Sequence, residues 1–185
     1  MLPAEVKRHR FTVEEYHEMG RAGVLSEDDR VELIDGEIVE MTPIGWRHAN
    51  CVNSLNMLLA RFAQEDRYVV GVQNPLTISE HGEPQPDLVL LRRQPQERLP
   101  GPDDVALLVE VSDSTLAYDK NVKLPRYARA GVVEVWIVDL AGRQVEVHSD
   151  PSLEGYRASR AFGPGERVSS PSVKELSLPV DEILA

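Results

Sequence analysis

The segment from residue 105 to residue 111 constrains the fold of this chain more than any other, because it is apolar apart from Glu110. An apolar run of this length, rich in valine and leucine, is typical of a central strand that is buried on both faces of a sheet. A carboxylate inside such a strand is costly to bury unless it is paired or bound to a cation. We therefore expect this segment at the centre of a sheet, with a specific partner for Glu110.

Further strands are predicted around this centre, because short β-rich runs are separated by glycine, proline and charged residues. The Asp35-Gly36 pair between two alternating apolar segments predicts a hairpin over residues 30–41. A second hairpin is predicted to join residues 133–139 to residues 143–149. The other predicted strands are 68–72, 76–79 and 87–91, and the prolines and glycines after Tyr156 predict short edge strands and turns.

Capping signals and periodicity predict the helices. Thr12 and Glu15 form a capping-box pattern, which predicts a helix over residues 13–19. Apolar residues recur at steps of three and four along residues 46–64, which predicts an amphipathic helix that packs on the sheet. No repeat or linker interrupts the chain, so we expect one domain of the α/β or α+β class.

A third helix is predicted over residues 115–130. Its packed side would carry Val122, Tyr127 and Ala130, and Gly131 is placed as a stop signal. Pro125 must kink this helix or begin its regular part.

The composition excludes several kinds of protein. The formal charge of −11 argues against a protein that coats nucleic acid nonspecifically, because such binding is driven by lysine and arginine. No apolar run in the 185 residues is long enough to span a bilayer, and the first ten or so residues lack the apolar core of a signal peptide. The single cysteine, Cys51, cannot form an internal disulfide, and we assign it no chemistry. These observations together predict a cytoplasmic protein.

Two acidic residues are the candidates for chemistry. Asp87 opens one predicted strand and Glu110 lies near the end of the next, so neighbouring strands would bring the two carboxylates together. Mg²⁺ takes oxygen ligands and often only one or two protein carboxylates. The alternatives are that Pro86-Asp87 is simple turn chemistry, or that the carboxylates are solvated or ion-paired.

The ordered set of motifs resembles a known family. A Pro-Asp pair followed by an acidic residue in an apolar strand is similar to the signature of the PD-(D/E)XK nuclease superfamily, and the chain looks like its bacterial Uma-type restriction-endonuclease family, known as a domain of unknown function. The matching segments are Val31-Glu32-Leu33-Ile34-Asp35-Gly36-Glu37, His48, Pro86-Asp87, Glu110-Val111-Ser112-Asp113-Ser114, Asp119 with Lys123 and Tyr127, and Gly131 through Trp136-Ile137-Val138-Asp139.

The resemblance implies a restriction-endonuclease-like mixed central sheet flanked by helices. The N-terminal hairpin and the C-terminal strands would be additions to this sheet, and the core would cover about residues 30–140. Asp87, Glu110 and the backbone carbonyl of Val111 would hold Mg²⁺, or Mn²⁺ in its place. The metal would polarise the scissile phosphate and lower the pKa of a bound water.

One position departs from the superfamily pattern. Ser112 stands where a catalytic lysine is usual, and the resemblance implies that the lysine has moved to the next helix as Lys123. There its ammonium would orient the attacking water. The alternative for Lys123 is a surface ion pair with Asp119, four residues earlier, and Lys120 is the rival candidate.

Other residues have weaker assignments. Glu32 either supports the metal or faces solvent from its strand. His48 is a packing residue or donates to a substrate phosphate, and Ser112 and Lys120 are the other candidates for substrate binding. We expect Tyr127 and Trp136 in the core, because each falls on an apolar face of its element.

These residues together predict a metal-dependent endonuclease that hydrolyses phosphodiester bonds, with DNA favoured over RNA. Such enzymes often act as homodimers or larger homo-oligomers, so that two sites reach two strands. Two other functions stay open. The chain could be a noncatalytic binding or assembly module that retains the fold, or a carboxylate-metal enzyme that acts on a small phosphorylated molecule. No glycine-rich phosphate loop supports the second.

Overall fold

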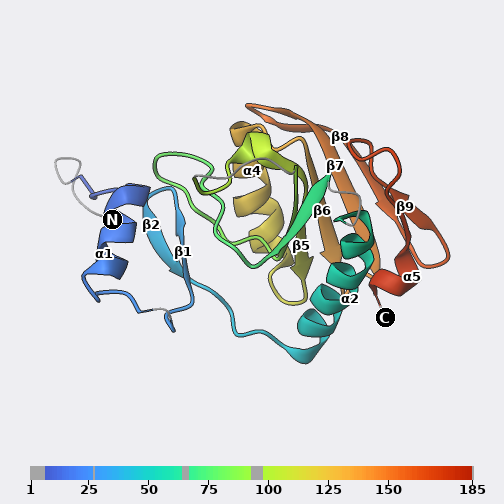
Figure 1. The fold of residues 1–185 in the computed structure, drawn as a ribbon, viewed down its shortest axis with the longest axis horizontal. Helices are drawn as coiled ribbons and strands as arrows, with labels where there is room; N and C mark the ends of the chain where they lie inside the picture. The colour runs from blue at the N-terminus through green and yellow to red at the C-terminus, as the bar shows by residue number, and fades with distance from the viewer. Residues whose placement is uncertain (1–6, 27, 64–66, 93–97, 185) are drawn as a thin grey trace.

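The computed structural model describes residues 7–26, 28–63, 67–92 and 98–184. Within these residues, the main body is a mixed sheet with the strand order β3-β4-β5-β6-β7-β8 (Figure 1). Neighbouring strands are antiparallel except for β5 and β6, which are parallel. The strands are β3 (Tyr68–Val72), β4 (Leu88–Arg92), β5 (Val105–Ser112), β6 (Glu134–Asp139), β7 (Gln144–Ser152) and β8 (Gly155–Phe162).

Strand β5 lies inside the sheet, as its apolar sequence predicts. All of its residues are buried, because helices cover both faces of the sheet. Helix α2 (Trp46–Ala63) packs on one face, together with the C-terminal helix α5 (Val180–Ile183). The helical segment that ends at Ala130 packs on the other face through Tyr127. The predicted fold class, a mixed sheet flanked by helices, is therefore confirmed, and Trp136 and Tyr127 lie in the core as expected.

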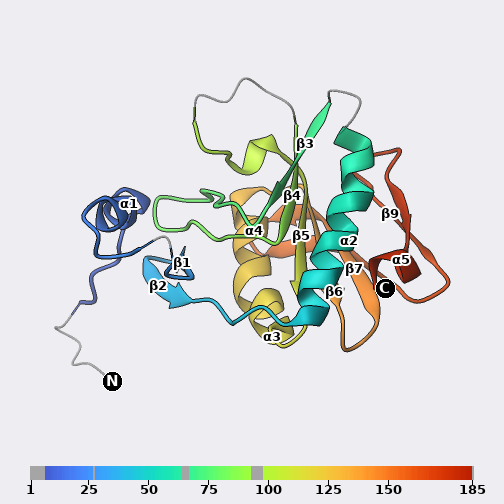
Figure 2. The ribbon, with the colours of Figure 1, turned by 60° about the horizontal axis from the view of Figure 1, so that its bottom comes forward.

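The N-terminal elements form a separate layer beside the sheet (Figure 2). Helix α1 (Val13–Arg21) begins with the predicted capping box of Thr12 and Glu15. The predicted hairpin is also confirmed, as β1 (Val31–Ile34) and β2 (Glu37–Glu40). Both turn residues have positive φ, 52° at Asp35 and 80° at Gly36, as a tight hairpin turn with the twist of its strands requires.

The third predicted helix is present but irregular. It consists of α3 (Leu116–Tyr118), the π-helix η2 (Asp119–Lys123) and α4 (Leu124–Ala130), with Pro125 in the first turn of α4 and Gly131 as its left-handed cap. The predicted packed side is confirmed only at Tyr127, which is fully buried, since Val122 and Ala130 are only partly buried. Lys123 is buried instead of Val122, because both lie in the π-helix, whose wider turn changes the direction of its side chains.

One predicted strand is wrong. Residues 76–79 form an irregular loop that returns through a single bridge between Ser79 and Gly82. The nearby Pro75, Pro84 and Pro86 have no amide hydrogen, so they cannot donate to a regular ladder.

The other boundaries follow the predictions closely. Helix α2 ends at Ala63, and residue 64 of the predicted helix lies outside the described residues. The hairpin of β6 and β7 is confirmed. In the C-terminal part, β8 is longer than the short edge strands expected there. It is followed by β9 (Arg167–Ser169), β10 (Ser177–Pro179) and the unpredicted α5, and a 3-10 turn, η1 (Pro102–Asp104), precedes β5. No helix of the described residues is both long and apolar enough to cross a membrane.

Candidate active site

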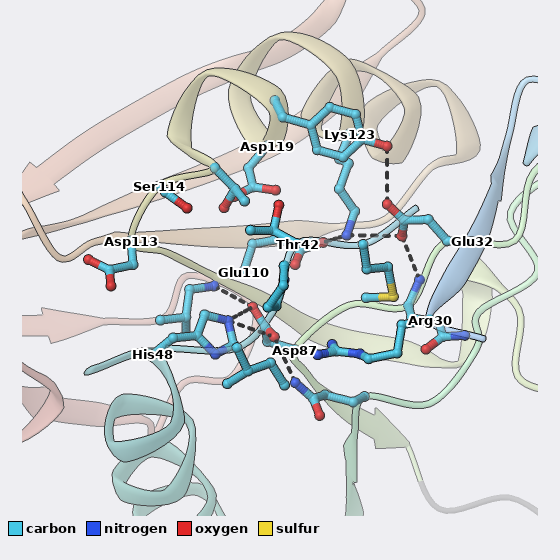
Figure 3. A pocket seen from close by; sticks show the side chains of 18 of the residues that line it. Arg30, Glu32, Thr42, His48, Asp87, Glu110, Asp113, Ser114, Asp119 and Lys123 are labelled. Atoms are coloured by element: carbon cyan, nitrogen blue, oxygen red, sulfur yellow. Dashed lines mark hydrogen bonds and ion pairs between the residues drawn. The ribbon is translucent and has the colours of Figure 1, made fainter. Parts of the chain in front are cut away.

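Most of the predicted site residues meet at a pocket of about 430 Å³ between the N-terminal hairpin and the central sheet (Figure 3). One wall comes from β1 and β2, and the floor comes from the ends of β4 and β5. The start of α2 and the segment α3–η2 complete the pocket. Its lining includes Glu32, His48, Asp87, Glu110, Val111, Asp119 and Lys123.

Asp87, the residue immediately before β4, lies opposite Glu110 of the neighbouring strand β5. β4 and β5 are antiparallel with Leu88 paired to Val109, so one further step of this register places Asp87 beside Glu110. The condition on which the sequence prediction rested, that the two strands are neighbours, is therefore confirmed.

Contacts on three sides hold the Asp87 carboxylate. The amide of Val111 donates to it at 2.8 Å, Nε2 of His48 lies 3.1 Å away, and Nε2 of Gln73 donates at 3.3 Å. In a β-strand, the amide N–H and the carbonyl of one residue point toward the same side of the strand. The carbonyl oxygen of Val111 therefore also points toward the Asp87 side, as an oxygen ligand at this place would have to.

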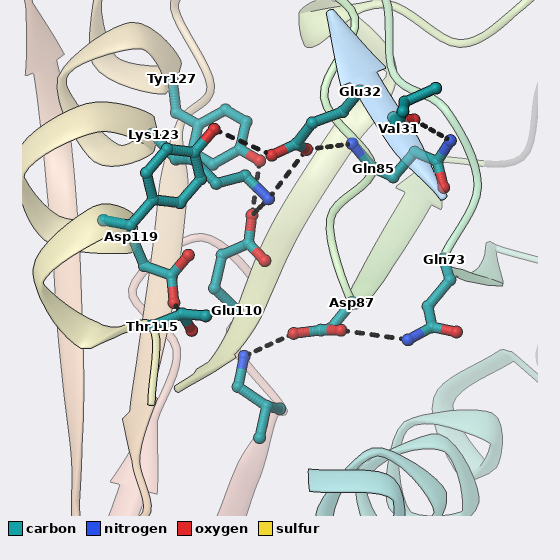
Figure 4. A network of polar contacts seen from close by, with 12 residues as sticks. Val31, Glu32, Gln73, Gln85, Asp87, Glu110, Thr115, Asp119, Lys123 and Tyr127 are labelled. Atoms are coloured by element: carbon teal, nitrogen blue, oxygen red, sulfur yellow. Dashed lines mark hydrogen bonds and ion pairs between the residues drawn. The ribbon is translucent and has the colours of Figure 1, made fainter. Parts of the chain in front are cut away.

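Glu110 uses one oxygen for two partners. Nζ of Lys123 lies 2.7 Å from Oε1, and the hydroxyl of Tyr127 donates to the same atom at 2.5 Å (Figure 4). Oε2 has no hydrogen bond or ion pair with any described residue. Burial raises the pKa of Glu110 to about 8 against the effect of the Lys123 ammonium, and the charges of Asp87 and Asp119 add to the rise.

Lys123 bridges two carboxylates. Besides Glu110, its Nζ lies 3.3 Å from Glu32, whose own oxygens accept from the hydroxyl of Tyr118 at 3.1 Å and from the amide of Gln85 at 3.0 Å. Burial opposes the charge on Lys123, but Glu110 and Glu32 outweigh it and raise the pKa of Lys123. Lys123 therefore stays an ammonium inside the site.

Two alternatives for these residues are wrong. Lys123 is 4% exposed and its ion pairs run to Glu110 and Glu32, so it does not form a surface pair with Asp119. Glu32 is 3% exposed, so it does not face solvent.

Ser112 lies beneath the pocket and pairs with Asp119, which lines it. The Ser112 hydroxyl donates to Asp119 at 2.7 Å, and the Thr115 hydroxyl donates to the same oxygen at 2.6 Å. Burial raises the pKa of Asp119, and these two hydroxyls oppose the rise. Ser112 is fully buried and does not line the pocket.

The other two predicted substrate-binding residues lie in different places. His48 reaches the pocket from the first turn of α2, where its hydrogen bond to Asp87 raises the pKa of the imidazole against the effect of burial. Its Nδ1 is buried and has no partner among the described residues. Lys120 does not line the pocket, because its Nζ forms an ion pair with Glu146 of β7 at 2.6 Å.

Several site residues were missed or misread in the sequence. Tyr127 was assigned only to the core, although it lies one helical turn after Lys123 and could have been expected on the same face. Gln85 could likewise have been expected near the site, because it lies two residues before Asp87. Gln73 and Tyr118 carry no such signal, because tertiary packing alone brings them to the site.

The donor set fits a hard divalent cation. Asp87, Glu110 and the Val111 carbonyl supply oxygen atoms only. The pKa of Glu110 is raised by burial and, to a smaller extent, by the charges of Asp87 and Asp119, and a bound cation would relieve this repulsion. In the parts of the chain that are described, no three His, Cys, Asp or Glu side chains are grouped to hold a metal.

A mixed sheet flanked by helices, with opposed carboxylates at two neighbouring strands, defines a restriction-endonuclease-like protein. The family model Uma2, described as "Putative restriction endonuclease", matches residues 13–181, and the chain belongs to this family.

Comparison with solved structures supports the fold. The chain is similar to a crystal structure described as "a putative nuclease belonging to DUF820" from Anabaena variabilis, with a TM-score of 0.73 and 18% identity, over 94% of this chain and 97% of that one. No curated protein matches the chain.

Proposed function

We propose that the chain is a metal-dependent endonuclease that hydrolyses phosphodiester bonds in DNA. The observation that carries the proposal is the opposition of Asp87, the residue before β4, to Glu110 of β5, with Nζ of Lys123 2.7 Å from Glu110. Membership of a family described as restriction endonucleases favours DNA over RNA as the substrate.

Asp87, Glu110 and the carbonyl oxygen of Val111 would hold Mg²⁺, with Mn²⁺ as a substitute. When bound, the cation would polarise the scissile phosphate and lower the pKa of a coordinated water. His48 and Gln73 orient the Asp87 carboxylate, and Tyr127 fixes Oε1 of Glu110 so that Oε2 is left for a ligand.

Lys123 has the role of positioning the attacking water. Its ammonium is buried and held between Glu110 and Glu32, so its place relative to the reacting phosphate is defined before substrate arrives. A fixed positive charge also stabilises the negative charge that develops on the phosphate in the transition state. Glu32 acts through Lys123, as the second carboxylate that keeps the ammonium in place.

The proposal extends to assembly and location. A homodimer, or a larger homo-oligomer, would bring two sites to the two strands of a duplex. The single cysteine is unpaired and buried, which agrees with a cytoplasmic location.

The test combines metal binding with DNA cleavage. Calorimetry with Mg²⁺ and Mn²⁺ and plasmid nicking are carried out on the wild type and on the double variant Asp87→Ala, Glu110→Ala. We expect the wild type to bind metal and nick DNA and the double variant to do neither. Full nicking by the double variant contradicts the assignment. A wild type that binds no metal and cuts no DNA favours the noncatalytic module instead.

Glu134→Gln is the matched control. Glu134 is a buried carboxylate on β6, the neighbour of β5, but it does not line the pocket. This variant should bind metal and nick DNA as the wild type does. A loss of metal binding and nicking in the double variant is then due to the change in the site, and not to the removal of a buried carboxylate in general.

A further inference from the structure

Arg30 is a charged residue of the pocket that the proposed mechanism leaves unused. Among the described residues, six carboxylates line the pocket, and Arg30 and Lys123 are the two permanently charged cations. Lys123 is held by Glu110 and Glu32. The guanidinium of Arg30 has no hydrogen bond or ion pair with any described residue. It is therefore the cation of the pocket that remains available to a ligand.

The hairpin sets the direction of the Arg30 side chain. The carbonyl of Arg30 accepts from the amide of Met41 at 2.8 Å, which places Arg30 at the open end of the hairpin, opposite Met41. Residues two apart in a strand share a face, so Arg30 lies on the same face as Glu32. Val39 and Met41 face the same way from the paired strand, and all four residues line the pocket (Figure 3).

We propose that Arg30 binds a backbone phosphate of the substrate strand, next to the scissile phosphate. A polynucleotide that enters this pocket meets an excess of carboxylates in a chain of net charge −11, so an unpaired cation at the wall provides the attraction that the rest of the pocket lacks. The planar guanidinium donates two parallel hydrogen bonds to phosphate oxygens, which an ammonium cannot do.

The proposal rests on the proposed function for the identity of the ligand, a polynucleotide. It does not rest on cleavage, because phosphate binding by Arg30 needs no reaction. It also makes the N-terminal hairpin a substrate-binding element as well as the carrier of Glu32.

The experiment measures binding of a fluorescently labelled DNA duplex by anisotropy, with Ca²⁺ in place of Mg²⁺ to prevent cleavage, over a series of salt concentrations. Arg30→Ala should weaken binding by about tenfold, the effect of losing one charge-assisted contact. It should also lower the slope of log affinity against log salt by about one. A structural role would leave this slope unchanged. Arg30→Lys keeps the charge, so it should keep the slope and lose part of the affinity.

Arg157→Ala is the matched control for charge. Arg157 is exposed on β8, which lies three strands from β5 in the sheet, and it does not line the pocket. The Arg30 guanidinium forms no hydrogen bond or ion pair with any described residue, so the Arg30 variants should unfold close to the wild-type temperature.

The outcomes separate the two proposals. If Arg30→Ala binds with the wild-type affinity and slope, or is weakened only as much as Arg157→Ala, the role of Arg30 is overturned even when the wild type nicks plasmid. A wild type that binds no DNA also overturns it. Binding that depends on Arg30 in a protein that never cleaves supports the role of Arg30, while the nuclease proposal fails.

Discussion

Two buried carboxylates on neighbouring strands, Glu110 of β5 and Glu134 of β6, are treated very differently by the structure. Glu134 is fully buried and accepts from Nε1 of Trp136 at 2.6 Å, from the hydroxyl of Ser170 at 2.7 Å and from the amide of Ser172 at 2.9 Å. These donors use both of its oxygens. Glu110 is equally buried, but both of its partners meet one oxygen and the other oxygen is left without any described partner.

The difference shows how a buried acid can be structural in one place and chemical in another. A carboxylate whose two oxygens both accept hydrogen bonds from neutral donors has no remaining capacity for a ligand, so its role is structural. A buried carboxylate with partners at only one oxygen has a pKa raised by burial and, to a smaller extent, by acidic neighbours. The free oxygen and these neighbouring charges favour a cation. Glu134 is the first kind of carboxylate and lies against the C-terminal segment. Glu110 is the second kind and lies at the pocket.

The largest expected effect comes from Lys123→Met. Removing the ammonium takes away a fixed positive charge near the reacting phosphate, and the rate of nicking at saturating Mg²⁺ should fall by about 10² to 10³-fold. Metal binding, measured by calorimetry, should persist because the carboxylates remain. Lys120→Met is the matched control, since Lys120 pairs with Glu146 outside the pocket. Loss of nicking in Lys120→Met alone would transfer the role to Lys120.

The next largest effect is a difference in the free energy of unfolding between variants of Glu134 and of Glu110. Glu134→Ala leaves three donors without an acceptor in the core, so the free energy of unfolding in urea should fall by about 3 kcal/mol, with metal binding retained. Glu110→Ala should cost less, because it removes repulsion from Asp87 and Asp119 and leaves Lys123 with Glu32. Equal losses of stability in the two variants would remove the distinction between them.

A smaller effect is expected from pH. The pKa of Glu110 is raised from 4.5 to about 8, so between these values the folded state holds a proton that the unfolded state has released. This contribution to stability is present below pH 4.5 and is lost as the pH rises through 8. A metal must displace the same proton, so Mg²⁺ affinity should rise with pH, by at most about tenfold per unit, and level off above the pKa.

Calorimetry of Mg²⁺ binding over a pH series checks this expectation. A Mg²⁺ affinity that does not change between pH 4.5 and about 8 would mean that Glu110 is already ionised over this range. Glu134→Gln serves as the control, because its pocket still contains Glu110 and should give the same dependence.

The smallest expected effect comes from Tyr127→Phe. The lost hydroxyl frees Oε1 of Glu110, so metal affinity should fall by about tenfold, as for other residues that orient a ligand. Tyr156→Phe is the control, since this partly buried tyrosine donates to the carbonyl of Val132 outside the pocket. If the two variants bind metal equally well, the Tyr127 hydroxyl has no part in orienting Glu110 for the metal and its role is only structural.

Local signals in the sequence were enough for much of the fold. The Thr12–Glu15 capping box and the Asp35-Gly36 turn are each determined by residues close in the chain, and both were predicted correctly. The central position of β5 follows from its own apolar run. The strand predicted over residues 76–79 failed because the prolines that prevent its pairing belong partly to the returning segment.

The candidate site could be predicted only in part. Asp87 and Glu110 stood out as a Pro-Asp pair and as a charge in an apolar run, but their opposition depends on a strand register that no local pattern specifies. The contact of Glu32 with Lys123 joins a hairpin to a helix far away in the sequence. The availability of Arg30 is also a tertiary property, because it depends on which carboxylates have already found other partners.

The π-helix η2 makes the site depend on the number of residues in a segment as well as on their identity. A π-turn amounts to one residue inserted into an α-helix, and each residue of an α-helix turns the next by about 100°. A deletion of one residue within Asp119–Lys123 that restored regular α-helical spacing would change the orientation of Lys123 relative to α4 and to Glu110, although every site residue would still be present. Among relatives of this chain, the length of this segment is therefore as informative about an intact site as the presence of its acidic residues and its lysine.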